Sequence, residues 1–163
     1  MIFYAPRHLT ILTTLIHTAL WRTYPPNTNY ALLQNLHKAP ILDLQWSLSA
    51  PLLYTASADH TLGYTDLTTG QRVRRVRGHR GVVNAIDRTI AGGAGVELLA
   101  SAADDGTVKV WEGGEEGQKE AVSTFEIGCP ATAVCWSADG TQLFVGALDN
   151  EIHVCSISLF PSQ

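Results

Sequence analysis

Histidine, serine or threonine, and aspartate recur along the chain in groups that could serve nucleophilic hydrolysis. Two groups share this make-up: His79 with Ser101 and Asp105, and His37 with Asp59 and either Ser57 or Thr55. In a serine hydrolase the aspartate orients an imidazole that takes the proton of the attacking hydroxyl. Such a set occurs once per site, and its serine often lies on a strained turn such as G-x-S-x-G, a pattern that this sequence lacks. We therefore predict that these groups contain no catalytic residue.

A repeated set of side chains indicates a repeated structural task. We expect each aspartate to accept a hydrogen bond from an imidazole in the loop that enters a sheet. The imidazole would also contact a strand hydroxyl and, in the second group, the indole N–H of Trp111, so that each buried polar group has a partner. The third repeat has Val145, Ala147 and Cys155 where polar partners would be. We expect it to pack through apolar contacts, because losing both partners of a hydrogen bond leaves neither unpaired.

The elements that position these groups repeat with a fixed period. Asp59, Asp105 and Asp149 recur at intervals of about 45 residues, the interval that is typical of β-propeller blades. Apolar side chains alternate with other residues after each aspartate, which indicates a strand. Two more strands are expected before each turn, and an outer strand follows in the segments from Gln71 and from Ala121. One period therefore holds the strands of one blade.

We predict an all-β fold, a partial β-propeller of about three four-stranded blades plus the remnant of a fourth. The expected parts are a degenerate N-terminal segment over residues 1–20, a partial propeller over 21–157 with a blade remnant at 21–24 and blades at about 31–77, 78–127 and 128–157, and a tail over 158–163. Closed propellers usually have four to eight blades, so these units alone do not close a ring. We expect the chain to self-associate unless missing blades or another chain cover its exposed sheet faces.

The sequence resembles the WD-repeat family. Gly78-His79 and Trp111-Glu112 stand for the paired signatures of that family, although no intact Trp-Asp dipeptide is present. Three stretches are similar to the WD-repeat subunits of U-five-type splicing ribonucleoproteins: DLTTGQRVRRVRGHRGVVN from Asp66, DDGTVKVWE from Asp104 and ADGTQLFVGALDNEIHV from Ala138. The resemblance implies a nuclear, non-catalytic scaffold whose partners are proteins of the splicing ribonucleoprotein, with RNA contacted only indirectly.

Five arginines lie close together in the sequence: Arg72, Arg74, Arg75, Arg77 and Arg80. They fall on the outer strand of a blade and on the loop that follows it. No aromatic residues are interleaved to stack the bases of single-stranded RNA. The favoured interpretation is a solvated strand that discourages edge pairing, and the alternative is contact with an acidic or phosphate-bearing partner.

Composition excludes several other classes of protein. The formal net charge of −4 argues against a dedicated nucleic-acid binder, whose affinity depends on Lys and Arg neutralising phosphates. Cys129, Cys135 and Cys155 form no C-x-x-C pair and fit a reducing compartment. The six histidines show no H-x-x-x-H spacing, and the glycine-rich stretches lack the Lys-Ser/Thr of a phosphate-binding loop. We predict no metal site and no cofactor.

Three alternatives to a splicing scaffold remain. The chain could be a truncated, non-functional WD-repeat fragment, an adaptor in another nuclear or cytoplasmic complex, or a secreted or membrane-tethered protein led by residues 1–20. Residues 1–20 contain an apolar stretch that resembles a secretory signal, although Arg7, His8 and His17 interrupt it and no positively charged region precedes it. It is too broken to span a membrane, so no membrane partner is expected.

Overall fold

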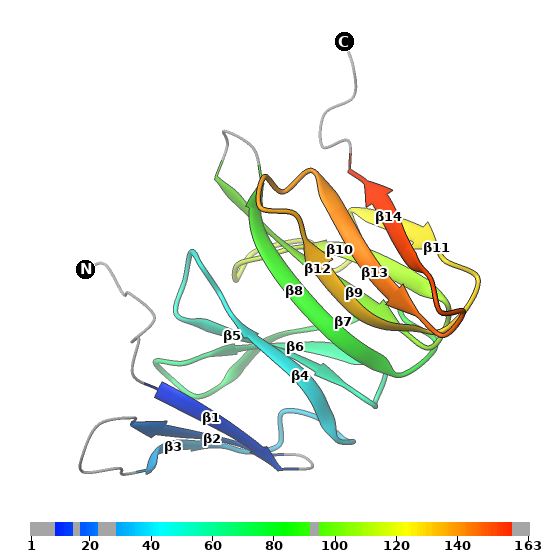
Figure 1. Cartoon of the computed structure of the whole chain (residues 1–163). Coiled ribbons are helices and arrows are strands. Elements are labelled where there is room, and N and C mark those ends of the chain that lie inside the picture. The colour runs from blue at the N-terminus through cyan, green and yellow to red at the C-terminus, as the bar shows by residue number, and fades with distance from the viewer. Residues whose placement is uncertain (1–8, 15–16, 23–28, 92–94, 158–163) are drawn as a thin grey trace.

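The described part of the chain consists of β-strands arranged in four antiparallel sheets (Figure 1). A computed structural model describes residues 9–14, 17–22, 29–91 and 95–157. Within these ranges there is no helix, and so none that is long and apolar enough to cross a membrane. The predicted all-β fold is confirmed.

The sheets follow one another along the chain and are numbered here in that order. Sheet 1 contains β1 (Leu9–Thr14), β2 (His17–Arg22) and β3 (Asn29–Leu33). Sheet 2 contains β4 (Ile41–Trp46), β5 (Leu52–Ser57), β6 (Thr61–Asp66) and β7 (Arg72–Arg77). Sheet 3 contains β8 (Val83–Ala91), β9 (Val96–Ala103), β10 (Thr107–Glu112) and β11 (Ser123–Glu126). Sheet 4 contains β12 (Ala131–Trp136), β13 (Gln142–Ala147) and β14 (Ile152–Ser156).

The N-terminal boundary differs from the one expected from the sequence. Strand β1 and most of β2 lie in the segment 1–20 that was expected to be degenerate, and β3 begins at Asn29, before the expected blade start at residue 31. Apolar residues and threonines do not alternate regularly over this segment, so its periodicity does not identify a strand. Residues 1–8, positions 23–24 of the expected blade remnant and the tail 158–163 lie outside the described residues.

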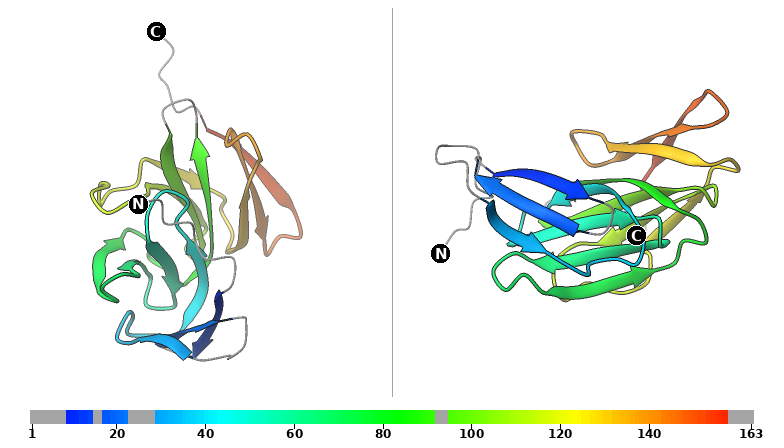
Figure 2. Two further views of the ribbon diagram at one scale, coloured as in Figure 1. Left: turned by 90° about the vertical axis from the view of Figure 1, so that its left-hand side faces the viewer. Right: turned by 90° about the horizontal axis from the view of Figure 1, so that it is seen from below.

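The sheets pack face to face in series, with sheets 1 and 4 at opposite ends (Figure 2). The first strands of sheets 2, 3 and 4 lie beside one another, so β8 contacts both β4 and β12. Apolar side chains fill the spaces between sheets: Tyr54 and Trp111 between sheets 2 and 3, and Val110 and Leu143 between sheets 3 and 4. Burying each large side chain contributes roughly 1.5–3 kcal/mol. Sheet 3 is therefore covered on both faces.

The three C-terminal sheets share two local irregularities at equivalent places. Each first strand shifts register near its start, between Ile41 and Asp43 in β4 and correspondingly in β8 and β12. Each turn between the second and third strands has a residue in the left-handed region directly after its aspartate, with φ of 66° at His60, 76° at Gly106 and 66° at Asn150. Glycine and asparagine adopt this conformation most readily. These shared details show that sheets 2–4 are copies of one unit.

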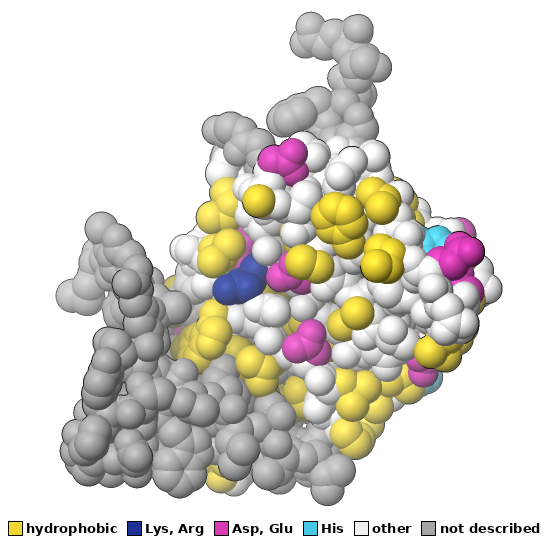
Figure 3. Space-filling view, in the orientation of Figure 1, with side chains coloured by type: hydrophobic (Ala, Val, Ile, Leu, Met, Phe, Trp, Pro, Cys, Tyr) yellow, Lys and Arg dark blue, Asp and Glu magenta, His cyan; other side chains and the backbone are white. Residues whose placement is uncertain are grey.

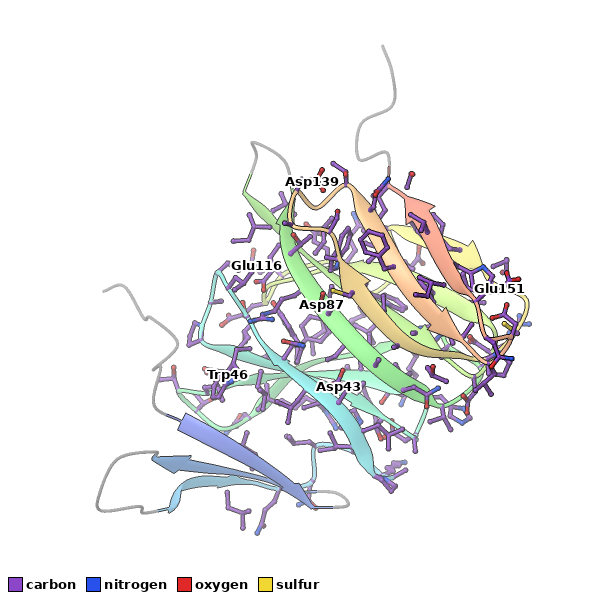
Figure 4. All side chains as sticks on the ribbon, viewed as in Figure 1. Asp43, Trp46, Asp87, Glu116, Asp139 and Glu151 are labelled. Carbon is purple, nitrogen blue, oxygen red and sulfur yellow. The ribbon has the colours of Figure 1, made fainter. Side chains whose placement is uncertain are left out.

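Acidic side chains link the inner strands of neighbouring sheets. Asp43 and Asp87, both labelled in Figure 4, lie on β4 and β8. Asp43 Oδ2 accepts a hydrogen bond of 2.9 Å from the Ile86 amide, and Asp87 Oδ2 accepts one of 2.8 Å from the Trp136 amide. Each carboxylate thus bonds to the backbone of the next sheet along the chain. Since these bonds cross the interface, they fix the position of one sheet against the next.

Candidate functional site

A buried hydrogen-bonded chain joins the entry loop of sheet 3 to its turn. His79 Nδ1 lies 3.1 Å from Asp105 Oδ2, and His79 Nε2 lies 2.7 Å from Ser101 Oγ. The indole Nε1 of Trp111 donates to the same hydroxyl over 2.8 Å. Because Asp105 is an acceptor, the proton of a neutral imidazole belongs on Nδ1, and Ser101 donates its own proton to Nε2. Each hydrogen bond of this network then joins one donor to one acceptor.

Asp105 is held by backbone groups as well as by the imidazole. Its carboxylate accepts hydrogen bonds from the Arg80 amide at 2.7 Å, the Thr107 amide at 3.0 Å and the Thr107 hydroxyl at 2.7 Å. Burial alone would raise the pKa of Asp105, but these bonds and the attraction of His79 lower it to about 2. Burial lowers the pKa of His79, against the opposing attraction of Asp105. The folded chain therefore favours a neutral imidazole beside a carboxylate.

Sheet 2 contains a similar network of hydrogen bonds, and of the two candidate hydroxyls the one that takes part is that of Thr55. His37 Nδ1 lies 3.1 Å from Asp59 Oδ1, and its Nε2 lies 2.8 Å from Thr55 Oγ1. Ser57 does not contact the imidazole. Its hydroxyl donates to the Ala39 carbonyl at 3.1 Å and accepts from the Asp59 amide at 3.1 Å. Thr55, and not Ser57, is the equivalent of Ser101 in the strand register. Thr55 lies two positions farther from the turn than Ser57 does, and this is the place that Ser101 has in sheet 3.

These groups are too buried to act on a substrate. The side chains of His37 and His79 are 0% and 1% exposed, and Ser101 is completely buried. Both ring nitrogens of each imidazole are already occupied by neighbours in the same sheet. A nucleophile needs a free approach for the reacting atom, about 3 Å from it. The arrangement instead stabilises the turn against the entry loop.

The five clustered arginines do not form one solvated surface. Arg74 is buried, and its guanidinium lies over the Tyr64 ring at 3.9 Å from the centroid. It also donates to the Glu112 carbonyl of sheet 3. Alternation along β7 places Arg74 on the same side as the buried Val76, so it is covered by the next sheet. The favoured interpretation of a fully solvated strand is therefore wrong for Arg74.

Two other arginines also make bonds within the chain. Arg75 forms an ion pair with Asp59, and its Nε donates to Thr61 Oγ1 at 3.0 Å. Arg72 donates to the Leu36 carbonyl at 2.6 Å. Arg77 and Arg80 are exposed. Of the five, these two have the most freedom to contact a partner.

A buried glutamate that the sequence analysis did not identify connects sheets 2 and 3. Glu97 begins the buried part of β9 and accepts hydrogen bonds from Ser47 Oγ at 2.5 Å, Ser49 Oγ at 2.5 Å, the Leu48 amide at 2.7 Å and Tyr54 Oη at 3.0 Å. All four donors belong to sheet 2 or to the loop after β4. The partners are more than forty residues away, and only the S-L-S loop between two strands could have suggested them.

Sheet 4 has a different group at its turn. Val145 is buried and Cys155 packs against the core between sheets 3 and 4, at the positions expected to be apolar. Asp149 nevertheless has polar neighbours: His153 Nε2 at 2.8 Å and the Glu151 amide at 3.0 Å. Cys129, in the loop before β12, lies close to the same carboxylate. The signal that could have revealed this group is Gly128-Cys129, which stands where Gly78-His79 stands one repeat earlier.

Comparisons with known proteins agree with this architecture. The family model described as WD domain, G-beta repeat, matches residues 31–63, 70–112 and 120–156. The chain resembles the crystal structure of the WD40 beta propeller domain of Doa1 with a TM-score of 0.77 at 17% identity, covering 96% of this chain and 49% of that one. This likeness concerns the fold alone. It confirms the predicted partial propeller.

Two curated relatives are similar over most of the chain. The pre-mRNA-splicing factor cwf17 of Schizosaccharomyces pombe is 39% identical over 135 residues, covering 83% of this chain and 38% of that protein. The U5 small nuclear ribonucleoprotein 40 kDa protein of Dictyostelium discoideum is 35% identical over 138 residues, covering 85% and 37%. The chain thus spans less than two fifths of each relative. The repeated sheets, the turn networks and the family match together show that this chain belongs to the WD-repeat family.

Proposed function

We propose that this chain is a non-catalytic protein-interaction scaffold of the pre-mRNA splicing machinery, of the U5 small nuclear ribonucleoprotein type, and that it acts in the nucleus. The observation that carries the proposal is the 39% identity to a pre-mRNA-splicing factor and the 35% identity to a U5 small nuclear ribonucleoprotein protein, each over more than four fifths of the chain. Its partners would be proteins of that assembly, with RNA contacted through them. The net charge of −4 supports indirect contact with RNA.

The structure supports rigid display of surface residues as the mechanism. The histidine, hydroxyl and aspartate side chains of the turn networks in sheets 2 and 3 bond to one another, and they hold each turn to its entry loop. Carboxylates fix sheet 2 against sheet 3 and sheet 3 against sheet 4. A surface that is fixed before binding loses little conformational entropy when a partner docks. Such a surface suits a scaffold that must hold several proteins in a defined geometry.

Basic side chains mark one candidate contact surface, the turn-side rim, defined here by Lys38, Arg77 and Arg80. All three are exposed. The amides of Lys38 and Arg80 donate to Asp59 and Asp105, so the two entry loops are fixed at the same end of their sheets as the turns. Arg77 ends β7 beside this turn, paired with Thr61. The rim fits a protein segment that carries carboxylates or phosphates.

Purification from nuclear extract tests the proposal. The tagged full chain is expected to recover U5 ribonucleoprotein proteins, and to keep them after ribonuclease treatment because protein contacts carry the binding. Recovery of no splicing protein, or of an unrelated complex alone, would contradict it. Loss of every partner after ribonuclease treatment would contradict the indirect role of RNA.

A pair of matched charge reversals tests the turn-side rim. Arg80→Glu is expected to reduce recovery of the partner, whereas Lys119→Glu changes charge equally on an exposed loop at the other end of sheet 3 and is expected to leave recovery unchanged. Equal recovery with both variants would show that the rim is not the contact surface.

A further inference from the structure

Three side chains with metal-binding atoms meet at the turn of sheet 4. One ligand atom each from Cys129, Asp149 and His153 lies within 4.8 Å of the other two. His153 Nε2 and Asp149 Oδ2 lie 2.8 Å apart. The residues come from the loop before β12, the turn after β13 and strand β14. The sequence predicted no metal site because the three residues follow no local histidine or cysteine motif, and only the fold brings all three together.

The group replaces the turn network of the other sheets. In sheets 2 and 3 an imidazole from the entry loop reaches the turn aspartate. In sheet 4 the entry loop supplies the Cys129 sulfur instead, and the imidazole comes from β14, where His153 pairs with Val145 as Lys109 pairs with Ser101. The hydroxyl and indole partners are absent from these register positions. A sulfur and an imidazole now face the same carboxylate.

We propose that Cys129, Asp149 and His153 bind a transition-metal ion, with Zn²⁺ as the best match. Thiolate sulfur, imidazole nitrogen and carboxylate oxygen are the three ligand types that Zn²⁺ takes in proteins. In a tetrahedral Zn²⁺ site, neighbouring ligand atoms lie about 3.3–3.6 Å apart, given usual zinc–ligand distances of about 2.0–2.3 Å. His153 Nε2 and Asp149 Oδ2 are closer than this, at 2.8 Å, and all three ligand atoms lie within 4.8 Å of one another, so the three groups are near enough to share one ion.

The local structure prepares the carboxylate for such an ion. The Glu151 amide, in the turn marked by the Glu151 label in Figure 4, donates to Asp149 Oδ1 at 3.0 Å. That bond orients the carboxylate and leaves Oδ2 directed at His153. The side chains of Asp149 and His153 are 32% and 28% exposed, so an ion from solvent can reach them. Three protein ligands leave one position for water or for a ligand from a partner.

A bound ion would tie the entry loop to the turn and to β14. The histidine–aspartate networks make the equivalent connection between loop and turn in sheets 2 and 3. The inference is independent of the proposed splicing role, since its test uses metal binding by the purified chain alone.

Cobalt titration of the full chain tests the site. Co²⁺ is expected to bind once per chain and to give a sulfur-to-cobalt charge-transfer band together with visible bands of a tetrahedral ion. Cys129→Ser should remove the charge-transfer band, and His153→Gln should weaken binding by more than about 100-fold, since loss of a direct ligand exceeds the loss of an outer-shell partner. Cys135→Ser and Cys155→Ser are matched controls that should retain the band. No band in the unaltered chain, or a band that survives Cys129→Ser, would overturn the proposal.

Alkylation of the unaltered chain gives a second test that does not depend on the folding of a variant. Zn²⁺ is expected to slow labelling of Cys129 by iodoacetamide, while labelling of the exposed Cys135 continues at the same rate. Mass spectrometry of the peptides measures both rates. Equal labelling of Cys129 with and without Zn²⁺ would overturn the proposal.

Discussion

At the scale of single residues, the turn network of sheet 3 includes an indole that the network of sheet 2 lacks. Trp111 completes the hydrogen-bonded chain of sheet 3 by donating to Ser101. Thr65 has the equivalent place in sheet 2, opposite Leu53 as Trp111 is opposite Leu99. The Thr65 hydroxyl is buried and has no hydrogen-bond partner among the described residues. An unpaired buried hydroxyl lowers the stability of the fold.

Replacing this hydroxyl should stabilise the chain. Thr65→Val keeps the shape of the side chain and is expected to raise the free energy of unfolding by about 1 kcal/mol, measured by urea denaturation. Thr55→Val is the matched control, because the same chemical change leaves His37 Nε2 without its partner and is expected to cost about 1–3 kcal/mol. Destabilisation of similar size by both variants would contradict the assignment of the two hydroxyls.

The turn networks should make stability depend on pH in two steps. Burial lowers the pKa of His79 below its ordinary 6.5, so its stabilising effect is complete above about pH 6.5 and is lost as pH falls towards the folded pKa. The pKa of Asp105 falls from 3.8 to about 2, so its effect is complete above about pH 4 and is lost between about pH 4 and pH 2. The urea midpoint should therefore decline first on mild and again on strong acidification.

Two histidine variants distinguish the effect of His79 on stability from the effects of other titrating groups. His79→Gln should lower the midpoint at neutral pH and reduce its decline between about pH 7 and pH 5. The exposed His60→Gln should retain the full decline. A midpoint that does not change over this range in the unaltered chain would contradict the coupling of His79 to folding.

Residue roles were only partly predictable from the sequence. The repeat spacing predicted that His79 and Asp105 belong together, because both lie at fixed positions around a turn. It could not separate Thr55 from Ser57, since both are hydroxyl residues on one face of β5 and only the strand register decides which meets the imidazole. The burial of Arg74 depends on sheet 3, whose contact with β7 is not encoded in local spacing.

At the scale of elements, the contacts between sheets depend on buried carboxylates. Glu97 accepts four hydrogen bonds from sheet 2 and the loop after β4. Glu97→Gln exchanges an acceptor oxygen for a donor that faces other donors. The variant is expected to lose about 1.5–3 kcal/mol in the free energy of unfolding, measured by urea denaturation. Exposed Glu126→Gln is the control and should change stability little; equal stability of the two variants would contradict the linking role of Glu97.

Strand positions in sheets 2–4 followed from the sequence because turns and alternation are local. The shared register shifts at the start of β4, β8 and β12 could not be predicted from the sequence, because a bulge is defined by the pairing of two strands. Strands β1 and β2 were missed for a related reason: their residues alternate poorly, and no aspartate-bearing turn marks them.

At the scale of the whole molecule, sheet 4 presents an apolar face to solvent. Phe144 and Val154 pair across β13 and β14 and are 40% and 54% exposed, and Ile152 beside them is 74% exposed. Hydrophobic side chains gather over these strands in Figure 3. Exposed apolar faces of this kind drive association.

The purified chain is therefore expected to self-associate at micromolar concentration. Val154→Lys places a charge on the apolar face and should shift the population towards monomer in light scattering. Val122→Lys is the matched control, because Val122 has the same 54% exposure but lies before β11, and it should leave association unchanged. A monomeric unaltered chain would contradict this expectation.

The central claim is that sheets 2–4 are copies of one unit and that each is stabilised mainly by its neighbours, which hydrogen exchange tests most directly. Sheet 3 is covered on both faces and retains a complete turn network, whereas β14 is largely exposed. The amides of β9 and β10 should therefore exchange most slowly, and those of β13 and β14 much faster. Exchange in β13 and β14 that is as slow as in β9 and β10 would contradict the claim.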